Sequence, residues 1–186
     1  MKKKMTQKLF DLSNKTIILT GSAGRLGSNF AEILADAGAN LVLIDINEKE
    51  NKKLEKRITK KFKIKCISSN ANITIKKELL ELAKIIIEKF GKIDGLVNNA
   101  FYNPRTNVEQ SARKFEDYSL DLWNDVVSVN LTGVFLCSQT FGKIMAKQKE
   151  GGSIVNISSI YGINGADQRI YGDSKLNSPP SYAATK

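Results

Sequence analysis

The C-terminal part of the sequence contains two tyrosines that are each followed, four residues later, by a lysine. The pairs are Tyr171 with Lys175 and Tyr182 with Lys186. Residues i and i+4 share one face of a helix, so the lysine ammonium would stand near the phenol. A neighbouring positive charge favours the phenolate and lowers the pKa of the tyrosine. Such a pair is suited to proton exchange with a substrate oxygen.

Only the second pair stands in a sequence that favours a helix. The residues after Tyr171 are typical of helix breaks: Gly172, Asp173, Asn177, Pro179 and Pro180. Tyr182 follows a proline and a serine, which are typical of a helix start, and precedes two alanines. We therefore predict that Tyr182 and Lys186 form the catalytic pair, and that Tyr171 lies in a loop on the substrate side.

Three glycines near the N-terminus form a second chemical motif, T-G-S-A-G-R-L-G at residues 20–27. The apolar and β-branched stretch Thr16–Thr20 predicts a short buried strand, and a helical pattern follows the motif. Gly21 permits a tight turn, Gly24 lets backbone N–H groups approach a pyrophosphate, and Gly27 lets the helix pack closely on the strand. The alternative is an ordinary strand-to-helix turn without a ligand.

A carboxylate follows at a position that suits a ribose. Residues 40–46, N-L-V-L-I-D-I, predict a second buried strand with Asp45 near its carboxyl end. Downstream of a glycine turn, such a carboxylate accepts hydrogen bonds from ribose hydroxyls. The alternative role for Asp45 is a cap for the charged helix expected over residues 47–61. Because neither Ile46 nor Asn47 is cationic, Asp45 favours NAD as the cofactor, with NADP less favoured.

The elements that position these motifs alternate along the chain. The first helix should end near Gly38, and the later strands and helices are expected at residues 64–67, 72–90, 93–100, 120–145 and 152–158. Residues 101–115 are polar and irregular and predict a loop over the carboxyl edge. Right-handed crossovers then give one doubly wound parallel α/β sheet, in a single domain over residues 1–186.

The composition excludes several other classes of protein. There is no histidine, and the spacing of Cys66 and Cys137 fits buried free thiols but no metal site. The net charge of +10 arises in residues 1–92, which hold 20 Lys and Arg against 10 Asp and Glu. Lysine-rich helices with few aromatics are typical of solvated faces, so neither nucleic acid nor membrane is expected as a partner. With no apolar leader, we expect a cytoplasmic protein.

Taken in order, the motifs resemble those of the short-chain dehydrogenase/reductase family from Lys15 to Lys186. The matching segments are T-G-S-A-G-R-L-G at Thr20, Asp45, N-N-A at Asn98, V-N-L-T-G around Asn130, G-G-S-I-V-N-I-S-S at Gly151 and Y-A-A-T-K at Tyr182. The resemblance implies a Rossmann fold and NAD(P)-dependent hydride transfer between a nicotinamide and a carbonyl or alcohol substrate.

The resemblance also assigns roles to individual residues. Tyr182 would exchange a proton with the substrate oxygen, and Lys186 would lower the pKa of Tyr182 and hold the nicotinamide ribose. Ser159 would hydrogen-bond the substrate oxygen, and Asn130 would support a water-linked proton path. The cofactor-binding residues would be Gly21, Ser22, Gly24, Arg25, Leu26, Gly27, Asp45, Asn72, Asn98, Ala100, Tyr182 and Lys186.

Several features depart from the family pattern. Arg25 replaces the usual middle glycine, Phe101 replaces the glycine after N-N-A, and Asn72 stands where an aspartate commonly contacts adenine. The loop I-Y-G-I-N-G-A-D-Q-R-I-Y-G-D resembles a subgroup associated with flagellin and nonulosonate sugar modification, which implies a sugar or nucleotide sugar as substrate.

Family members usually continue beyond the position of Lys186 through further strands and helices. We therefore expect a C-terminally truncated form, whose full-length counterpart would be a homo-oligomer. A helix around Tyr182 would need residues after Lys186, and the strand around Ile154 would expose an apolar edge. The alternative to an enzyme is a non-catalytic nucleotide-binding or partner-binding fragment.

Overall fold

The computed structural model describes residues 9–103, 114–174 and 176–186. Five parallel strands form one sheet in the order β3-β2-β1-β4-β5. The strands are β1 (Thr16–Thr20), β2 (Asn40–Ile44), β3 (Cys66–Ser69), β4 (Gly95–Asn98) and β5 (Ser153–Asn156). The order reverses between β1 and β4, so the carboxyl edge of the sheet has a crevice at that point.

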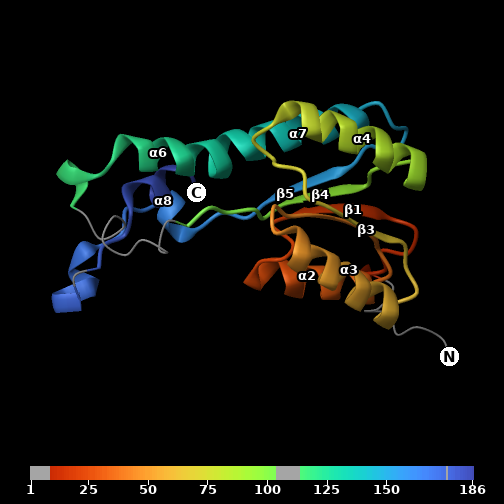
Figure 1. Ribbon diagram of the computed structural model, residues 1–186, viewed down its shortest axis with the longest axis horizontal. Helices are drawn as coiled ribbons and strands as arrows, with labels where there is room; N and C mark the ends of the chain where they lie inside the picture. Colours follow the sequence, from red (N-terminus) through yellow and green to blue (C-terminus); the bar gives the residue numbers. More distant parts are fainter. Residues whose placement is uncertain (1–8, 104–113, 175) are drawn as a thin grey trace.

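Helices cover both faces of the sheet, as Figure 1 shows. One layer contains α2 (Arg25–Asp36) and α3 (Glu48–Lys61), and the other contains α4 (Lys76–Phe90), α6 (Leu120–Val127) and α7 (Val134–Met145). Side chains of β1 alternate between the layers: Ile17 and Leu19 join the core under α2 and α3, and Ile18 joins the core under α4 and α7. The predicted doubly wound sheet is confirmed.

Three elements begin at least two residues later than the sequence pattern predicts, and one of them is β4, which starts at Gly95 instead of residue 93. β3 starts at Cys66, two residues after the expected position. α4 starts at Lys76, because Asn72 first forms a turn of its own. The side-chain oxygen of Asn72 accepts hydrogen bonds from the backbone N–H and the hydroxyl of Thr74, at 3.0 and 2.9 Å. A local side-chain bond of this kind competes with the helix for the same backbone groups.

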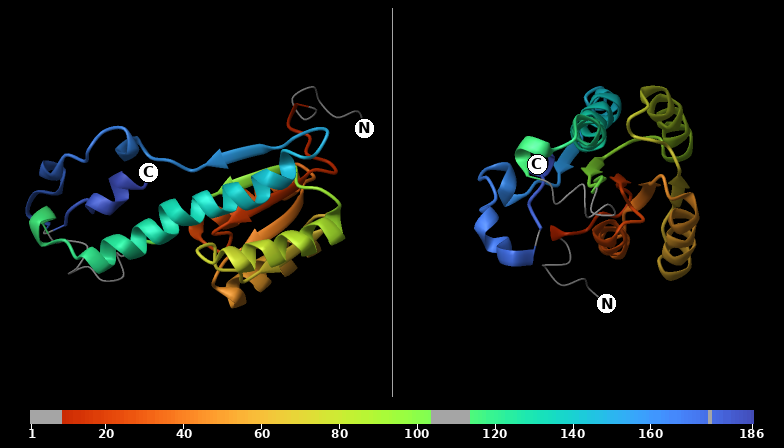
Figure 2. Two further views of the ribbon diagram at one scale, coloured as in Figure 1. Left: turned by 90° about the horizontal axis from the view of Figure 1, so that it is seen from above. Right: turned by 60° about the vertical axis from the view of Figure 1, so that its left-hand side comes forward.

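The long helix expected over residues 120–145 is interrupted. Between α6 and α7, residues Ser128–Gly133 form a π-helical segment, although the axis continues as one rod that extends past the sheet in Figure 2. Asn130 lies inside this segment with 5% of its surface exposed. A widened turn inside an α-helix is frequently associated with a functional site.

The C-terminal part of the chain is much less buried than the rest. β5 lies at the edge of the sheet with all four residues exposed, and Ile154 and Val155 expose 40% and 49% of their surface. The expected apolar edge is therefore confirmed. The expectation that a helix at Tyr182 needs further residues is wrong, because α8 (Pro180–Ala184) forms beside α6 and its buried Ser181 contacts Tyr118.

Two smaller findings concern the cysteines and the helices. Cys66 and Cys137 are free and buried, and burial raises the pKa of each thiol to about 12. Among the described residues, none of the helices has the length and apolar character needed to cross a membrane.

Candidate active site

The glycine motif forms the turn between β1 and α2, and close contacts require glycine at Gly21 and Gly27. Gly21 has a φ of +64°, and a Cβ there would lie 2.6 Å from the Cα of Ala100. A Cβ on Gly27 would lie 2.0 Å from the carbonyl oxygen of Gly21. Gly24 is the N-cap of α2 and offers no side-chain cap, and the first turn holds no acidic residue. The first backbone N–H groups of α2 are therefore suited to an anion.

Ser22 holds this turn from inside the protein. Its side chain is fully buried, and its hydroxyl donates a 2.7 Å hydrogen bond to the side-chain oxygen of Asn51 on α3. The Asn51 amide donates in turn to the carbonyls of Leu43 and Ser69, each at 3.0 Å. The Ser22 hydroxyl is thus engaged within the protein, and Asn51 ties the turn to β2, β3 and α3.

Asp45 directly follows β2 and touches the same turn. One carboxylate oxygen accepts the N–H of Ala23 at 2.9 Å, and the other accepts the N–H of Asn47 at 2.9 Å. The cap of α3 is Asn47, whose side chain accepts from Glu50, so Asp45 does not serve as the helix cap. Asp45 is partly buried, and it lines the main cavity of the site.

The N-N-A motif closes the other side of the turn. The Thr20 hydroxyl accepts the N–H groups of Asn99 and Ala100 at 3.0 Å each. The Asn99 amide donates to the carbonyls of Thr20 and Gly21 at 3.0 and 3.1 Å. The side chain of Asn98 points inward instead and donates to Ser138 on α7 and Asn156 on β5. The role of Asn98 in cofactor binding stays a prediction, and its side chain bonds within the core.

A cavity of about 410 Å³ extends along this edge from Asp45 to Phe101. Its floor includes Gly21 and Ala100, and Asn72 lines it beyond the end of β3. Arg25 and Leu26 are exposed in the first turn of α2. The structure thus gathers most of the predicted cofactor-binding residues around one turn and one cavity.

Asn130 anchors the segment after the N-N-A motif. Its side-chain oxygen accepts the N–H of Tyr102 at 2.7 Å, and its amide donates to the Tyr102 carbonyl at 3.2 Å. This two-point bond mimics a strand pairing and fixes the backbone next to Phe101. The predicted role of Asn130 in a proton path is not tested by this arrangement.

Tyr182 and Lys186 both contact the ring of Phe101. The rings of Tyr182 and Phe101 meet edge to face with centroids 5.4 Å apart, and Tyr161 meets Tyr182 at 6.3 Å. Lys186 Nζ lies 4.7 Å from the centre of the Phe101 ring and donates to the carbonyl of Ile157 at 2.9 Å. Burial lowers the pKa of Lys186. Lys186 stands two residues after the end of α8, and not within the helix as the spacing predicts.

Ser159 lies at the same end of β5. Its hydroxyl oxygen accepts the N–H of Tyr161 at 3.2 Å and caps a short 3-10 turn, Ile160–Gly162. The neighbouring Ser158 donates to the backbone carbonyl of Lys186, so the strand end and the segment after α8 are joined. A second cavity of about 230 Å³ lies beside Tyr182, Tyr161 and Phe101.

Tyr171, of the competing Tyr171–Lys175 pair, lies in a different conformation from Tyr182. Tyr171 lies in a 3-10 segment, Gln168–Ser174, that is broken at Gly172, with φ 47° and ψ −133°. The predicted helix break is confirmed. Lys175 lies outside the described residues.

Two residues that contact the candidate site, Asn51 and Tyr161, were not named from the sequence. Asn99 was named only as part of the N-N-A motif, and Phe101 only as a departure from the family pattern. Asn99 could have been found, since β1 and β4 pair in parallel and their carboxyl ends must meet. Asn51 gives no signal, because it is one polar residue in a highly charged helix.

Comparisons with known proteins agree with this geometry. The model of the short chain dehydrogenase family matches residues 15–177. A short-chain dehydrogenase/reductase of Botryotinia fuckeliana is 36% identical over 154 residues, which is 83% of this chain and 57% of that protein. The 5-keto-D-gluconate 5-reductase of Escherichia coli is 33% identical over 86% of this chain and 59% of its own length.

Solved structures resemble the chain in the same way. NAD+-bound xylitol dehydrogenase superposes with a TM-score of 0.80 at 27% identity, over 94% of this chain and 60% of that one. The chain thus spans somewhat more than half of the length of these relatives.

Proposed function

The chain belongs to the short-chain dehydrogenase family, and from that premise we propose that it forms the nucleotide-binding and catalytic part of an NAD-dependent oxidoreductase. The substrate would be an alcohol or a carbonyl compound. The observation that carries the proposal is the arrangement along one sheet edge. Asp45 and the open N-terminus of α2 lie at the start of the main cavity, and Tyr182 with Lys186 lies against Phe101 at its far end.

The residues at this edge fit a dinucleotide. Asp45 would accept hydrogen bonds from the adenosine ribose, and the backbone of the glycine turn would bind the pyrophosphate at the N-terminus of α2. Asn72 lines the cavity where adenine would lie. Lys186 would hold the nicotinamide ribose with the donors that Ile157 does not use.

When bound, the nicotinamide supplies or accepts a hydride at its C4. Tyr182 would donate its phenolic proton to the substrate oxygen during reduction and accept the proton during oxidation. The Lys186 ammonium would favour the phenolate, and Ser159 would donate a hydrogen bond to the substrate oxygen. Asn130 would keep the 101–103 segment beside this pair, and its part in a water-linked proton path stays a prediction.

The test compares two tyrosine variants of the chain with NAD+ and a panel of secondary alcohols and sugar alcohols. Tyr182→Phe removes only the ionisable oxygen, so turnover should fall by about 100-fold or more while the Kd for NAD+ is unchanged. Tyr171→Phe is the matched control and should mainly change KM. Loss of turnover in the Tyr171 variant, with normal turnover in the Tyr182 variant, would reverse the assignment.

The preference for NAD over NADP is proposed from Asp45. Its carboxylate would repel a 2′-phosphate, and Ile46 beside it is 76% exposed and carries no charge. Titration of the chain with NADH and NADPH should show tighter binding of NADH, and Asp45→Ala should reduce the difference. Tighter NADPH binding that Asp45→Ala does not alter would contradict this preference.

The class of substrate is a finer proposal. Two proteins similar to this chain are, by name, a xylitol dehydrogenase and a 5-keto-D-gluconate 5-reductase. They support a sugar or sugar alcohol as substrate in the panel above. A nucleotide sugar, the relation to flagellin or nonulosonate modification and the cytoplasmic location stay predictions.

A second candidate function is favoured by the exposed edge strand β5. A non-catalytic fragment would bind nucleotide, and its β5 edge would pair with another chain. This alternative predicts that the chain binds NAD+ without turnover of any substrate in the panel. NAD-linked turnover that is abolished by Tyr182→Phe would exclude it.

A further inference from the structure

Phe101 stands between the two cavities of the candidate active site. It lines the larger cavity, which contains Asp45, and also the smaller cavity, which contains Tyr182. Among the described residues, Tyr182 lines only the smaller one. A dinucleotide whose adenosine half binds at Asp45 and whose nicotinamide half reaches Tyr182 must therefore pass Phe101 and Tyr102, which both line the two cavities.

The ring of Phe101 also covers the group that would hold the nicotinamide ribose. Lys186 Nζ lies 4.7 Å from the ring centre, which is within the range of a cation–π contact. One of its three N–H groups is already used by the carbonyl of Ile157. The Tyr182 ring packs edge to face on the same phenyl group at an interplanar angle of 87°. Phe101 is thus the shared neighbour of both members of the proposed catalytic pair.

We propose that Phe101 is a specificity-determining residue, which lowers the affinity of the chain for the nicotinamide half of a dinucleotide and leaves the adenosine half unaffected. The inference rests on the nucleotide site proposed above. In this proposal a nicotinamide riboside that binds Lys186 displaces the phenyl ring, so the cation–π contact and the Tyr182 contact are lost on binding. A glycine at residue 101 would have no ring to displace.

The experiment compares NAD+ with ADP, which contains the adenosine and pyrophosphate but no nicotinamide. Isothermal titration calorimetry gives the Kd of each ligand for the chain and for Phe101→Ala. The variant should bind NAD+ about 3- to 30-fold more tightly, as expected for one cation–π contact that no longer has to be broken. The Kd for ADP should be unchanged.

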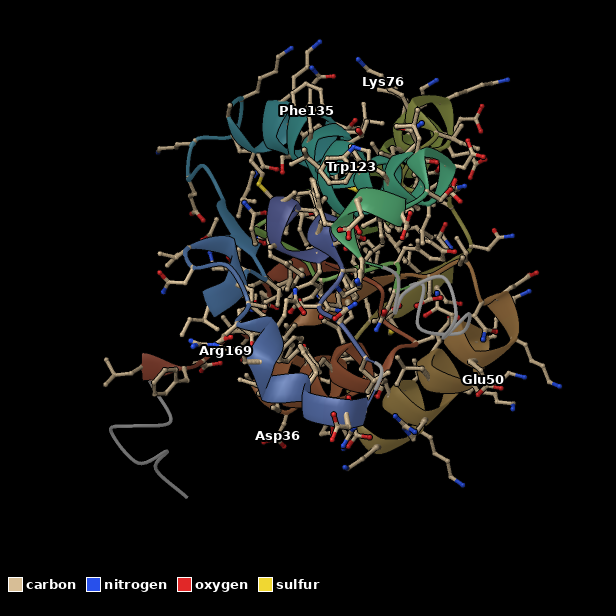
Figure 3. All side chains as sticks on the ribbon, turned by 90° about the vertical axis from the view of Figure 1, so that its left-hand side faces the viewer. Asp36, Glu50, Lys76, Trp123, Phe135 and Arg169 are labelled. Atoms are coloured by element: carbon tan, nitrogen blue, oxygen red, sulfur yellow. The ribbon has the colours of Figure 1, made fainter. Side chains whose placement is uncertain are left out.

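Two control variants separate this effect from general changes in the protein. Phe101→Tyr keeps an aromatic face and should bind both ligands like the original chain. Phe135→Ala removes an equally large ring from α7, where Phe135 is 57% exposed on the outer helical layer (Figure 3), and should change neither Kd. If Phe101→Ala does not give the circular dichroism spectrum of the folded chain, Phe101→Leu replaces it, since leucine keeps apolar volume without a π face.

The outcomes distinguish this inference from the function on which it rests. If ADP binds normally and the affinity for NAD+ is unchanged or reduced in Phe101→Ala, the role of Phe101 is refuted while the nucleotide site stands. If the original chain binds neither ADP nor NAD+, the proposed function is refuted and the role of Phe101 with it.

Discussion

Two parts of the carboxyl edge of the sheet hold the proposed site residues in different ways: the part around the central strand β1, called the nucleotide end, and the part around the edge strand β5, called the catalytic end. At the nucleotide end, every residue of β1 is buried, and Ser22, Asn51 and Asp45 fix the glycine turn through bonds to three elements. At the catalytic end, every residue of β5 is exposed. There, Tyr182 and Lys186 are held by ring contacts and a few hydrogen bonds close to the surface.

In the proposed enzyme, this difference would separate cofactor binding from chemistry. Burial of a fully hydrogen-bonded network makes a turn as stable as the core around it. Residues on an edge strand and a five-residue helix can open without unfolding of the whole sheet. We therefore expect changes at the nucleotide end to lower the stability of the whole sheet, and changes at the catalytic end to cause only local opening. The following variants test this expectation.

The largest loss of stability is expected when Gly27 is replaced by a residue with a side chain. In Gly27→Val the new Cβ would stand 2.0 Å from a backbone carbonyl oxygen that belongs to the buried turn. The free energy of unfolding, measured with urea, should fall by more than about 3 kcal/mol. Gly165→Ala is the control, because a Cβ there meets no atom within 4 Å. Equal stability of the two variants would mean that the nucleotide end is not rigid.

Loss of the Ser22 hydroxyl should lower the stability of the whole sheet by a smaller amount. Ser22→Ala leaves the buried side-chain oxygen of Asn51 without its 2.7 Å donor. We expect the free energy of unfolding to fall by about 1–3 kcal/mol, and protection from hydrogen exchange to fall throughout β1, β2 and α2. A loss of protection confined to the turn would show that the turn is independent of the sheet.

The sequence predicts the nucleotide end of the fold well, because each element there has a local signal. The bounds of β1 agree with its apolar stretch, and α4 ends before Gly91, which adopts the left-handed conformation with a φ of +78°. The π-helical segment around Asn130 could not be predicted. Asn130 within it accepts a hydrogen bond from the backbone of Tyr102, which is 28 residues away in the sequence, so no local signal marks the segment.

The candidate site also has some features with a local sequence signal and others without one. The choice of Tyr182 over Tyr171 follows from helix signals, and the structure places a helix at the first and a broken turn at the second. The contact of Phe101 with both Tyr182 and Lys186 has no local signal, since it joins two segments about 80 residues apart. The spacing of sequence motifs points to candidate residues such as Tyr182 and Lys186. It does not reveal a side chain, such as that of Phe101, that the fold places against them.

An intermediate loss of stability is expected from a change at Asp94, which directly precedes β4 and contacts the start of β1. Its side chain is 9% exposed, and its carboxylate accepts the N–H of Thr16 at 2.8 Å and contacts Lys15 and Lys92 at 3.1 Å each. Burial opposes ionisation, but these hydrogen bonds outweigh it and hold the pKa of Asp94 below its usual value. Its contribution to stability is therefore present above the unfolded pKa of about 3.9 and is lost as the pH falls through the folded pKa.

The corresponding measurement is urea unfolding between about pH 5 and pH 2. Asp94→Asn should be less stable than the original chain at pH 5 by about 1–2 kcal/mol, and the difference should shrink toward pH 2. A difference that stays constant over this range would show that the charge of Asp94 does not contribute.

The smallest effect on global stability is expected from Tyr118→Phe, which removes one hydroxyl at the catalytic end. The Tyr118 hydroxyl and Ser181 lie 2.7 Å apart, and Ser181 is fully buried at the start of α8. The change resembles Ser22→Ala, since each removes one hydroxyl from a hydrogen-bonded pair with a buried partner. Because α8 can open separately, the global free energy of unfolding should change by less than about 0.5 kcal/mol.

The local effect of Tyr118→Phe should nevertheless be measurable. Hydrogen exchange of the α8 amides should become about 2- to 10-fold faster, as expected for the loss of one hydrogen bond, while exchange in β1 and β2 is unchanged. The rings of Tyr182 and Phe101 should separate more often, while the affinity for ADP should stay the same because ADP would bind at the nucleotide end. If Tyr118→Phe instead lowers global stability as much as Ser22→Ala, the two ends of the sheet unfold together. The separation between a rigid binding end and a locally opening catalytic end would then be wrong.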